Sequence, residues 1–183
     1  LTASLRDRSV GIAGFGRIGK AVARRLEAFG LKVSYFGRKP QAGVSNRYYN
    51  DLVAMARDVD TLILVIPGGP TTANLVNAAV LEALGPRGIL INMARGSVVD
   101  EAALIAALKA RKILRAGLDV YVGEPNINPV YLELDNVTLL PHVGSASNYT
   151  RDAMGQLVVD NLVAFAEGRP PKTPVAETPF RGW

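Results

Sequence analysis

Near-continuous apolar runs alternate along this chain with amphipathic stretches. Such runs are typical of strands buried on both faces, and amphipathic stretches are typical of helices that cover a sheet. The predicted strands are Val10–Ala13, Lys32–Phe36, Thr61–Ile66, Gly88–Met93, Arg115–Val120 and Val137–Leu140. The predicted helices are Ile18–Phe29, Asp51–Arg57, Ala78–Leu84, Asp100–Ala110 and Asn148–Glu167. This alternation predicts an α/β fold, a doubly wound parallel sheet with helices on both faces.

The first predicted strand ends in a glycine-rich turn that runs straight into the first predicted helix. The turn reads Gly14-Phe15-Gly16-Arg17-Ile18-Gly19, with the spacing G-x-G-x-x-G. In a strand–turn–helix context, the first glycine permits the tight turn, the second lets the backbone approach a pyrophosphate, and the third lets the helix pack closely. The amides and dipole at the helix start favour phosphate. The motif therefore predicts a dinucleotide site in a Rossmann-type sheet, rather than a glycine-rich turn without a ligand.

The second predicted strand ends in a basic turn, Gly37-Arg38-Lys39. Recognition of the ribose 2′-hydroxyl of NAD calls for Asp or Glu about 20 residues after the glycines. No acidic residue lies between Glu27 and Asp51. Because Arg38 offers a planar fork and Lys39 a point charge, the turn favours a 2′-phosphate, although an ordinary basic surface turn is the alternative. The predicted cofactor is NADP, with NADPH preferred and NAD possible.

Composition and charge limit the class of protein, its location and the kinds of ligand that it can bind. The 183 residues, 49% hydrophobic and 20% charged, suit one globular α/β domain with a real core. No cysteine is present, which fits a cytoplasmic location, and no apolar run is long enough to cross a membrane. No signal peptide is visible, and the start at Leu1 suggests an excised or processed piece. The net charge of +5 is scattered, so we expect no nucleic-acid partner but a small anionic substrate.

Polar side chains follow three of the later predicted strands. Arg95 follows the fourth strand, Glu124 the fifth, and His142, the only histidine, the sixth. Because parallel strands place their carboxyl ends at one edge of the sheet, where the ligand crevice lies, we expect these groups together beside the cofactor. Alone, each has an ordinary reading as a surface or loop residue, but the set supplies a cationic anchor, an orienting carboxylate and a proton donor. Asp119 also ends a strand and is placed to contact the nicotinamide end.

Four segments resemble the nucleotide-binding domain of the D-isomer-specific 2-hydroxyacid dehydrogenases: Val10–Gly19, Ile91–Leu104, Ala116–Pro125 and Leu140–Ser147. The resemblance covers nearly all of residues 5–175, and residues 34–38 and 139–145 are most similar to the NADPH-preferring glyoxylate/hydroxypyruvate reductase branch. It implies that Arg95 binds substrate, that His142 is the acid/base, that Glu124 pairs with His142, and that the protein is a homodimer. The full set of expected cofactor contacts is Gly14, Phe15, Gly16, Arg17, Ile18, Gly19, Gly37, Arg38, Lys39, Ile66, Asp119, Gly144 and Ser145.

Members of that family have two domains, and both chain ends build the substrate domain. We therefore expect residues 1–175 to form the dinucleotide-binding domain and residues 176–183 to form a tail toward a substrate domain missing from this chain. The turn Pro67-Gly68-Gly69-Pro70 is unusually glycine-rich for the family.

The predicted function is NADP-dependent reduction of a small 2-keto acid, glyoxylate or hydroxypyruvate, with little turnover by this piece alone. The alternatives are a dinucleotide-gated interaction module resembling the C-terminal-binding-protein corepressors, and an NAD-linked relative such as phosphoglycerate dehydrogenase. The basic turn argues against the interaction module, because NAD sensing favours an acid at that position, and the NAD-linked relative differs mainly at the same turn.

Overall fold

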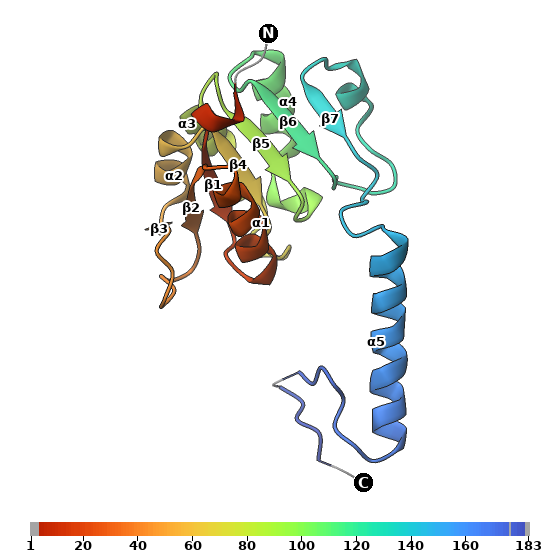
Figure 1. The fold of residues 1–183 in the computed structure, drawn as a ribbon. Helices are drawn as coiled ribbons and strands as arrows, with labels where there is room; N and C mark the ends of the chain where they lie inside the picture. The colour runs from red at the N-terminus through yellow and green to blue at the C-terminus, as the bar shows by residue number, and fades with distance from the viewer. Residues whose placement is uncertain (1–3, 176, 182–183) are drawn as a thin grey trace. The chain divides into compact units, whose positions relative to one another are not determined.

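The computed structural model describes residues 4–175 and 177–181 of the chain (Figure 1). It divides into two compact units, Leu1–Pro141 and His142–Trp183, which are described separately. The first unit holds the sheet, and the second holds one long helix and the segment that follows it. Residues 176, 182 and 183 of the predicted tail, like Leu1, lie outside the described residues.

The first unit is built on a seven-stranded sheet in the order β3-β2-β1-β4-β5-β6-β7, and all neighbouring strands pair in parallel. The strand order reverses between β1 and β4, so the crevice beside β1 is the topological switch point where such sheets bind ligands. The strands are β1 (Ser9–Ala13), β2 (Lys32–Phe36), β3 (Arg47–Tyr49), β4 (Thr61–Leu64), β5 (Ile89–Asn92), β6 (Arg115–Leu118) and β7 (Val137–Leu139). The helices of this unit are α1 (Arg17–Ala28), α2 (Leu52–Asp58), α3 (Ala78–Leu84) and α4 (Glu101–Lys109).

Two hydrophobic clusters lie on opposite faces of the sheet. Alternate residues of a strand point to opposite faces, and in β4 Leu62 joins one cluster while Ile63 joins the other. The larger cluster includes buried residues of α2, α3 and α4, and the smaller one includes Ala23 of α1. Helices therefore cover both faces, and the predicted Rossmann-type fold is confirmed.

The predicted helices match the observed helices to within one residue at each end. The strand predicted to reach Ile66 stops at Leu64, and the one predicted to reach Val120 stops at Leu118, because the chain leaves the ladder there to form the turns of the site. The edge strand β3 was not predicted, since its three residues, Arg-Tyr-Tyr, are too few to show an alternating pattern.

The second unit contains α5 (Asn148–Ala166), which begins at an N-cap formed by Ser147. The segment that follows α5 folds back onto this helix: Lys172 forms an ion pair with Asp160 at 2.7 Å. The amide side chain of Asn161 donates a hydrogen bond to the hydroxyl of Thr173 at 2.8 Å. Across the part of the chain that the structure describes, no helix combines the length and apolar content that crossing a membrane requires.

Candidate cofactor and active site

The glycine loop between β1 and α1 has the backbone geometry that its sequence predicts. Gly14 has a φ of +97°, and its N–H donates a hydrogen bond to the carbonyl of Phe36 at the end of β2. A Cβ atom at Gly14 would lie 2.7 Å from Cγ2 of Ile66, a predicted cofactor contact that is half-buried just beyond β4. Both the positive φ and the close neighbour require glycine here.

The other two glycines of the loop have different surroundings. A Cβ atom at Gly19 would collide with the carbonyl oxygen of Gly14, so glycine lets α1 pack tightly on the turn. A Cβ atom at Gly16 would meet nothing within 4 Å, because Gly16 faces open space at the start of α1. Gly16 is the N-cap and supplies no side-chain cap, and Arg17 and Ile18 beside it are exposed. The loop therefore fits a pyrophosphate, which would lie against Gly16 and the first amides of α1.

The basic turn after β2 is anchored at both ends and presents its charges to solvent. The hydroxyl of Tyr48 donates a hydrogen bond to the carbonyl of Gly37 at 3.1 Å. The backbone N–H of Gln41 donates to the hydroxyl of Tyr35 at 2.9 Å. Arg38 and Lys39 are exposed between these anchors. The turn thus presents two cations at the end of the strand beside β1, an arrangement suited to a phosphate on the adenine ribose.

Arg95 lies on a short turn after β5 that a buried asparagine holds in place. Asn92 is 1% exposed, and its side chain accepts a hydrogen bond from the N–H of Ala94 at 3.0 Å and donates one to the carbonyl of Arg95 at 3.1 Å. The Arg95 side chain is exposed. A Cβ atom at Gly68 would lie 2.7 Å from Cγ of Arg95, so the glycine-rich turn after β4 lies directly against the Arg95 side chain.

Glu124 lies on the loop after β6, which packs against the turn after β5. Glu124 is exposed, and its Oε1 accepts a hydrogen bond from the N–H of Tyr121 at 2.8 Å. Gly96 contacts the Tyr121–Val122 peptide so closely that a Cβ atom would collide with it. Asp119 is buried, and its N–H donates to the carbonyl of Asn92 at 3.0 Å. The structure therefore brings the turns that carry Arg95, Asp119 and Glu124 together at the carboxyl edge of the sheet.

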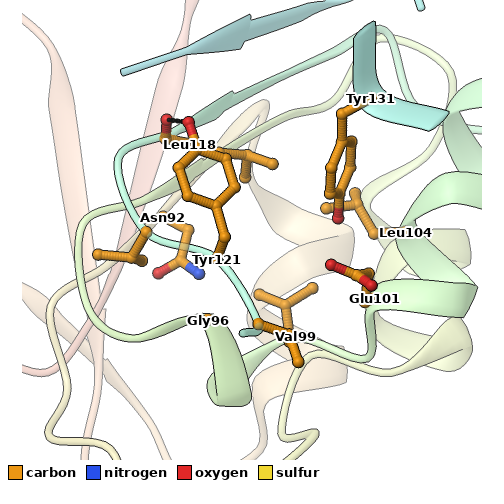
Figure 2. Close-up of a pocket in the computed structure, with 10 residues that line it drawn as sticks. Asn92, Gly96, Val99, Glu101, Leu104, Leu118, Tyr121 and Tyr131 are labelled. Atoms are coloured by element: carbon orange, nitrogen blue, oxygen red, sulfur yellow. Dashed lines mark hydrogen bonds between the residues drawn. The ribbon is translucent and has the colours of Figure 1, made fainter. Parts of the chain in front are cut away.

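A small cavity lies beside the turns that follow β5 and β6. The residues that line it include Asn92, Gly96, Tyr121 and Tyr131 (Figure 2). Its volume of about 10 Å³ is far below the roughly 300–1,000 Å³ of ligand pockets, so it is not the substrate site. Figure 2 shows the hydroxyl of Tyr131 pointing toward the carboxylate of Glu101. Burial, and then the negative charge of Glu101, raise the pKa of Tyr131 far above its ordinary value, so this hydroxyl stays protonated.

His142, Gly144 and Ser145 belong to the second unit. His142 is exposed and has a φ of +55°, in the left-handed region that histidine adopts more often than most residues. A turn follows it, in which the N–H of Ala146 donates to the carbonyl of Val143 at 2.9 Å. The predicted pairing of His142 with Glu124, and the predicted cofactor contacts of Gly144 and Ser145, stay predictions.

Several residues that shape the site were absent from the predicted set. Asn92 and Tyr121 hold the turns after β5 and β6, and Gly68 makes room for Arg95. Gln41 links the basic turn to the glycine loop. A buried asparagine that ends an apolar strand is a signal that sequence reasoning could have used, whereas nothing in the local sequence marks Gln41.

A parallel sheet with a glycine loop at its switch point and a cationic turn after the next strand defines a dinucleotide-binding domain of the Rossmann class. The chain belongs to the family described as D-isomer specific 2-hydroxyacid dehydrogenase, NAD binding domain, whose model matches residues 1–144. The family predicted from the sequence is thereby confirmed. Among the described residues, no group of His, Cys, Asp and Glu side chains forms a metal site.

Similar proteins come from several organisms. A 2-ketogluconate reductase of Gluconobacter oxydans (strain 621H) is 49% identical over 172 residues, which cover 94% of this chain and 56% of that protein. A glyoxylate/hydroxypyruvate reductase A of Arabidopsis thaliana is 43% identical over 175 residues, covering 96% of this chain and 56% of that protein. The chain therefore spans about half the length of these relatives.

The fold of this chain is also similar to solved structures of 2-hydroxyacid dehydrogenases and related reductases. An NADPH-dependent glyoxylate/hydroxypyruvate reductase of Sinorhizobium meliloti, in complex with NADP and malonate, superimposes with a TM-score of 0.93 at 57% identity. The match covers 98% of this chain and 56% of that one. The holo D-mandelate dehydrogenase of Rhodotorula graminis gives a TM-score of 0.92 at 31% identity, covering 99% of this chain and 54% of that one.

Proposed function

We propose that this domain binds NADPH in an oxidoreductase that reduces a small 2-keto acid, glyoxylate or hydroxypyruvate, to the 2-hydroxy acid. The observation that carries the proposal is the anchored turn after β2, which presents Arg38 and Lys39 where an NAD-binding domain would carry an acid. A carboxylate there would repel a 2′-phosphate, whereas the guanidinium fork of Arg38 can bind it through two hydrogen bonds. The NADP complex of the Sinorhizobium meliloti relative supports the same cofactor here.

The residues of the site divide the work of the reaction. When bound, the cofactor supplies a hydride for the keto carbon. The amides at Gly16 and the start of α1 hold the pyrophosphate, and Asp119 contacts the nicotinamide end. Arg95 binds the substrate carboxylate and polarises the carbonyl, since its fork matches a carboxylate. His142 gives the carbonyl oxygen a proton, and Glu124 orients the imidazole.

The proposal also covers the bounds of the domain, the cellular location and the oligomeric state. We assign residues 1–175 to the dinucleotide-binding domain and residues 176–183 to a tail toward a substrate domain. We also assign the protein to the cytoplasm as a homodimer. The cysteine-free sequence supports a reducing compartment, and the family resemblance supports the dimer.

Titration of this chain with NADPH and NADH, followed by calorimetry or nicotinamide fluorescence, tests the cofactor. We expect NADPH to bind about 10-fold or more tighter, from one charge-assisted phosphate contact. Equal affinities, or tighter NADH binding, would support the NAD-linked alternative. Turnover of a panel of glyoxylate, hydroxypyruvate and 2-ketogluconate by the full-length protein tests the substrate, and no turnover of any of them would favour the interaction-module alternative.

A further inference from the structure

One side chain connects the basic turn to the glycine loop. The side-chain amide of Gln41 donates a hydrogen bond from Nε2 to the carbonyl oxygen of Phe15 at 2.8 Å. Gln41 is half-buried, and it lies just past Arg38 and Lys39, while Phe15 lies between Gly14 and Gly16. This hydrogen bond spans 26 positions of the sequence and joins the two places where a dinucleotide would place its phosphates.

The acceptor determines what this hydrogen bond can do. In a planar trans peptide, the carbonyl and the N–H point in opposite directions. A hydrogen bond that holds the Phe15 carbonyl therefore also fixes the direction of the Gly16 N–H. Because Gly16 is the N-cap of α1 and faces open space, this N–H belongs to the group of amides available to a pyrophosphate.

A second set of contacts fixes the turn itself. The backbone N–H of Gln41 donates to the Tyr35 hydroxyl at 2.9 Å, and the Tyr35 ring stacks on the Phe15 ring with centroids 4.4 Å apart. Gln41 therefore contacts the glycine loop directly through its side chain and indirectly through Tyr35. The Tyr48 hydroxyl closes the other end of the turn at Gly37.

We propose that Gln41 is a positioning residue for cofactor choice, which holds the Arg38 turn at a fixed place relative to the glycine loop. The inference rests on the proposed function, because it assigns the 2′-phosphate to that turn. A ligand that binds both subsites gains most when the two are pre-organised, since a loose turn must be ordered on binding. NADH lacks the 2′-phosphate and does not use the charges of the turn. Loss of the hydrogen bond between Gln41 and Phe15 therefore weakens the binding of NADPH more than the binding of NADH.

The test is the ratio of NADH to NADPH dissociation constants, measured on this chain for Gln41→Met, which keeps the side-chain length and removes the donor. We expect the preference for NADPH to fall about 3- to 10-fold, as for loss of one hydrogen bond. In an Arg38→Ala background, Gln41→Met should not change the preference further, because the two residues act as one unit.

Asn46→Leu is the matched control. Asn46 is another amide on the same connection between β2 and β3, but its Nδ2 donates to Glu27 at 2.6 Å and to the carbonyl of Val33 at 3.0 Å. Neither acceptor lies in the glycine loop. Loss of this amide should lower the thermal stability and leave the cofactor preference unchanged.

Tyr35→Phe provides a second route to the same answer. It keeps the ring that stacks on Phe15 and removes the hydroxyl that accepts from the N–H of Gln41, so the preference should again fall. If Gln41→Met does not fold, the ratio of dissociation constants measured for Tyr35→Phe tests the proposal instead. An unchanged preference in the folded variants, or an equal loss of NADPH and NADH binding in Gln41→Met, would overturn the inference. A wild-type chain without any NADPH preference would overturn the proposed cofactor as well. If the preference for NADPH is lost in Arg38→Ala but kept in both Gln41→Met and Tyr35→Phe, only the role proposed for Gln41 is wrong.

Discussion

The hydroxyl of Tyr121 lies 2.7 Å from the carbonyl oxygen of Leu140 and donates a hydrogen bond to it. The same hydroxyl lies 2.9 Å from the carbonyl of Leu118, at the end of β6. Tyr121 also contacts Gly96 and Glu124. One residue therefore joins the ends of β6 and β7 to the turn after β5, and the chain continues from Leu140 to the proposed proton donor only two positions later.

Removal of that hydroxyl should affect chemistry more than cofactor binding. In the full-length protein, we expect Tyr121→Phe to lower kcat for keto-acid reduction about 3- to 10-fold, because the chain leading to His142 loses an anchor worth one hydrogen bond. The dissociation constant of NADPH should stay unchanged, since Tyr121 touches none of the proposed phosphate-binding residues. Steady-state kinetics and a binding titration measure the two effects. Tyr149→Phe is the control, because Tyr149 is 84% exposed on α5.

Arg38→Ala should weaken NADPH binding to this chain by about 1.5–3 kcal/mol and change NADH binding little. The reason is that Arg38 is assigned to the 2′-phosphate, which NADH lacks. Calorimetric titration with both cofactors checks the difference. Arg24→Ala on α1 is a matched control, since Arg24 is also exposed but lies outside the basic turn. Parallel losses for NADPH and NADH would contradict the assignment.

The glycine loop allows binding and folding to be tested separately. Gly16→Ala adds a methyl group where nothing lies within 4 Å, so the chain should still fold and should lose at most about 1 kcal/mol of stability, because alanine is a poorer N-cap than glycine. The same methyl group would occupy the space proposed for the pyrophosphate, so NADPH and NADH should both lose affinity. Gly19→Ala instead drives a methyl group into the Gly14 carbonyl and should cost about 1–3 kcal/mol of stability, as overpacking does.

Urea unfolding and cofactor titration of the two variants distinguish these effects. Retained cofactor binding in Gly16→Ala would place the pyrophosphate elsewhere. Full stability of Gly19→Ala would show that α1 can move away from the turn.

The sequence was sufficient for every strand of the sheet except β3, for the glycine loop and for the basic turn, because each depends on local chemistry within a few consecutive residues. The apolar runs of β1 and β4 indicate strands that are buried on both faces. The spacing of the glycines from Gly14 to Gly19 predicts the geometry of the turn. The contacts of Gln41 with Phe15 and of Tyr121 with Leu140 join residues 26 and 19 positions apart. Such pairs meet only once the strands have been ordered, so no local pattern reveals them.

Alkaline pH should destabilise the first unit through three tyrosines, of which Tyr131 and Tyr49 are buried and Tyr121 is half-buried. Burial raises the pKa of Tyr131 and of Tyr121, and burial followed by the hydrogen bond with Asp58 raises the pKa of Tyr49. A raised pKa means that the folded chain holds the proton more tightly than the unfolded chain does. The stabilising contribution is therefore complete below the ordinary tyrosine pKa of about 10 and is lost as the pH rises through the raised values.

We expect the urea midpoint to be level between about pH 8 and 9 and to fall above about pH 10. Tyrosinate absorbance should show a delayed phase that coincides with unfolding. Tyr131→Phe should reduce that phase. A midpoint that rose above about pH 10 would contradict the sign of these shifts.

The proposed proton donor makes the most direct demand on the full-length protein. His142→Ala removes the only histidine, and we expect kcat with glyoxylate and hydroxypyruvate to fall about 10²- to 10⁴-fold, the usual contribution of general acid catalysis. NADPH affinity should change little, because the residues proposed to bind its phosphates lie on the glycine loop and the basic turn. Arg95→Lys separates the roles, since it keeps the charge but loses the fork, and should raise KM for the keto acid as well as lower the rate. Steady-state kinetics with a parallel NADPH titration measures both. Near-wild-type kcat in His142→Ala with both substrates would remove this histidine from the mechanism.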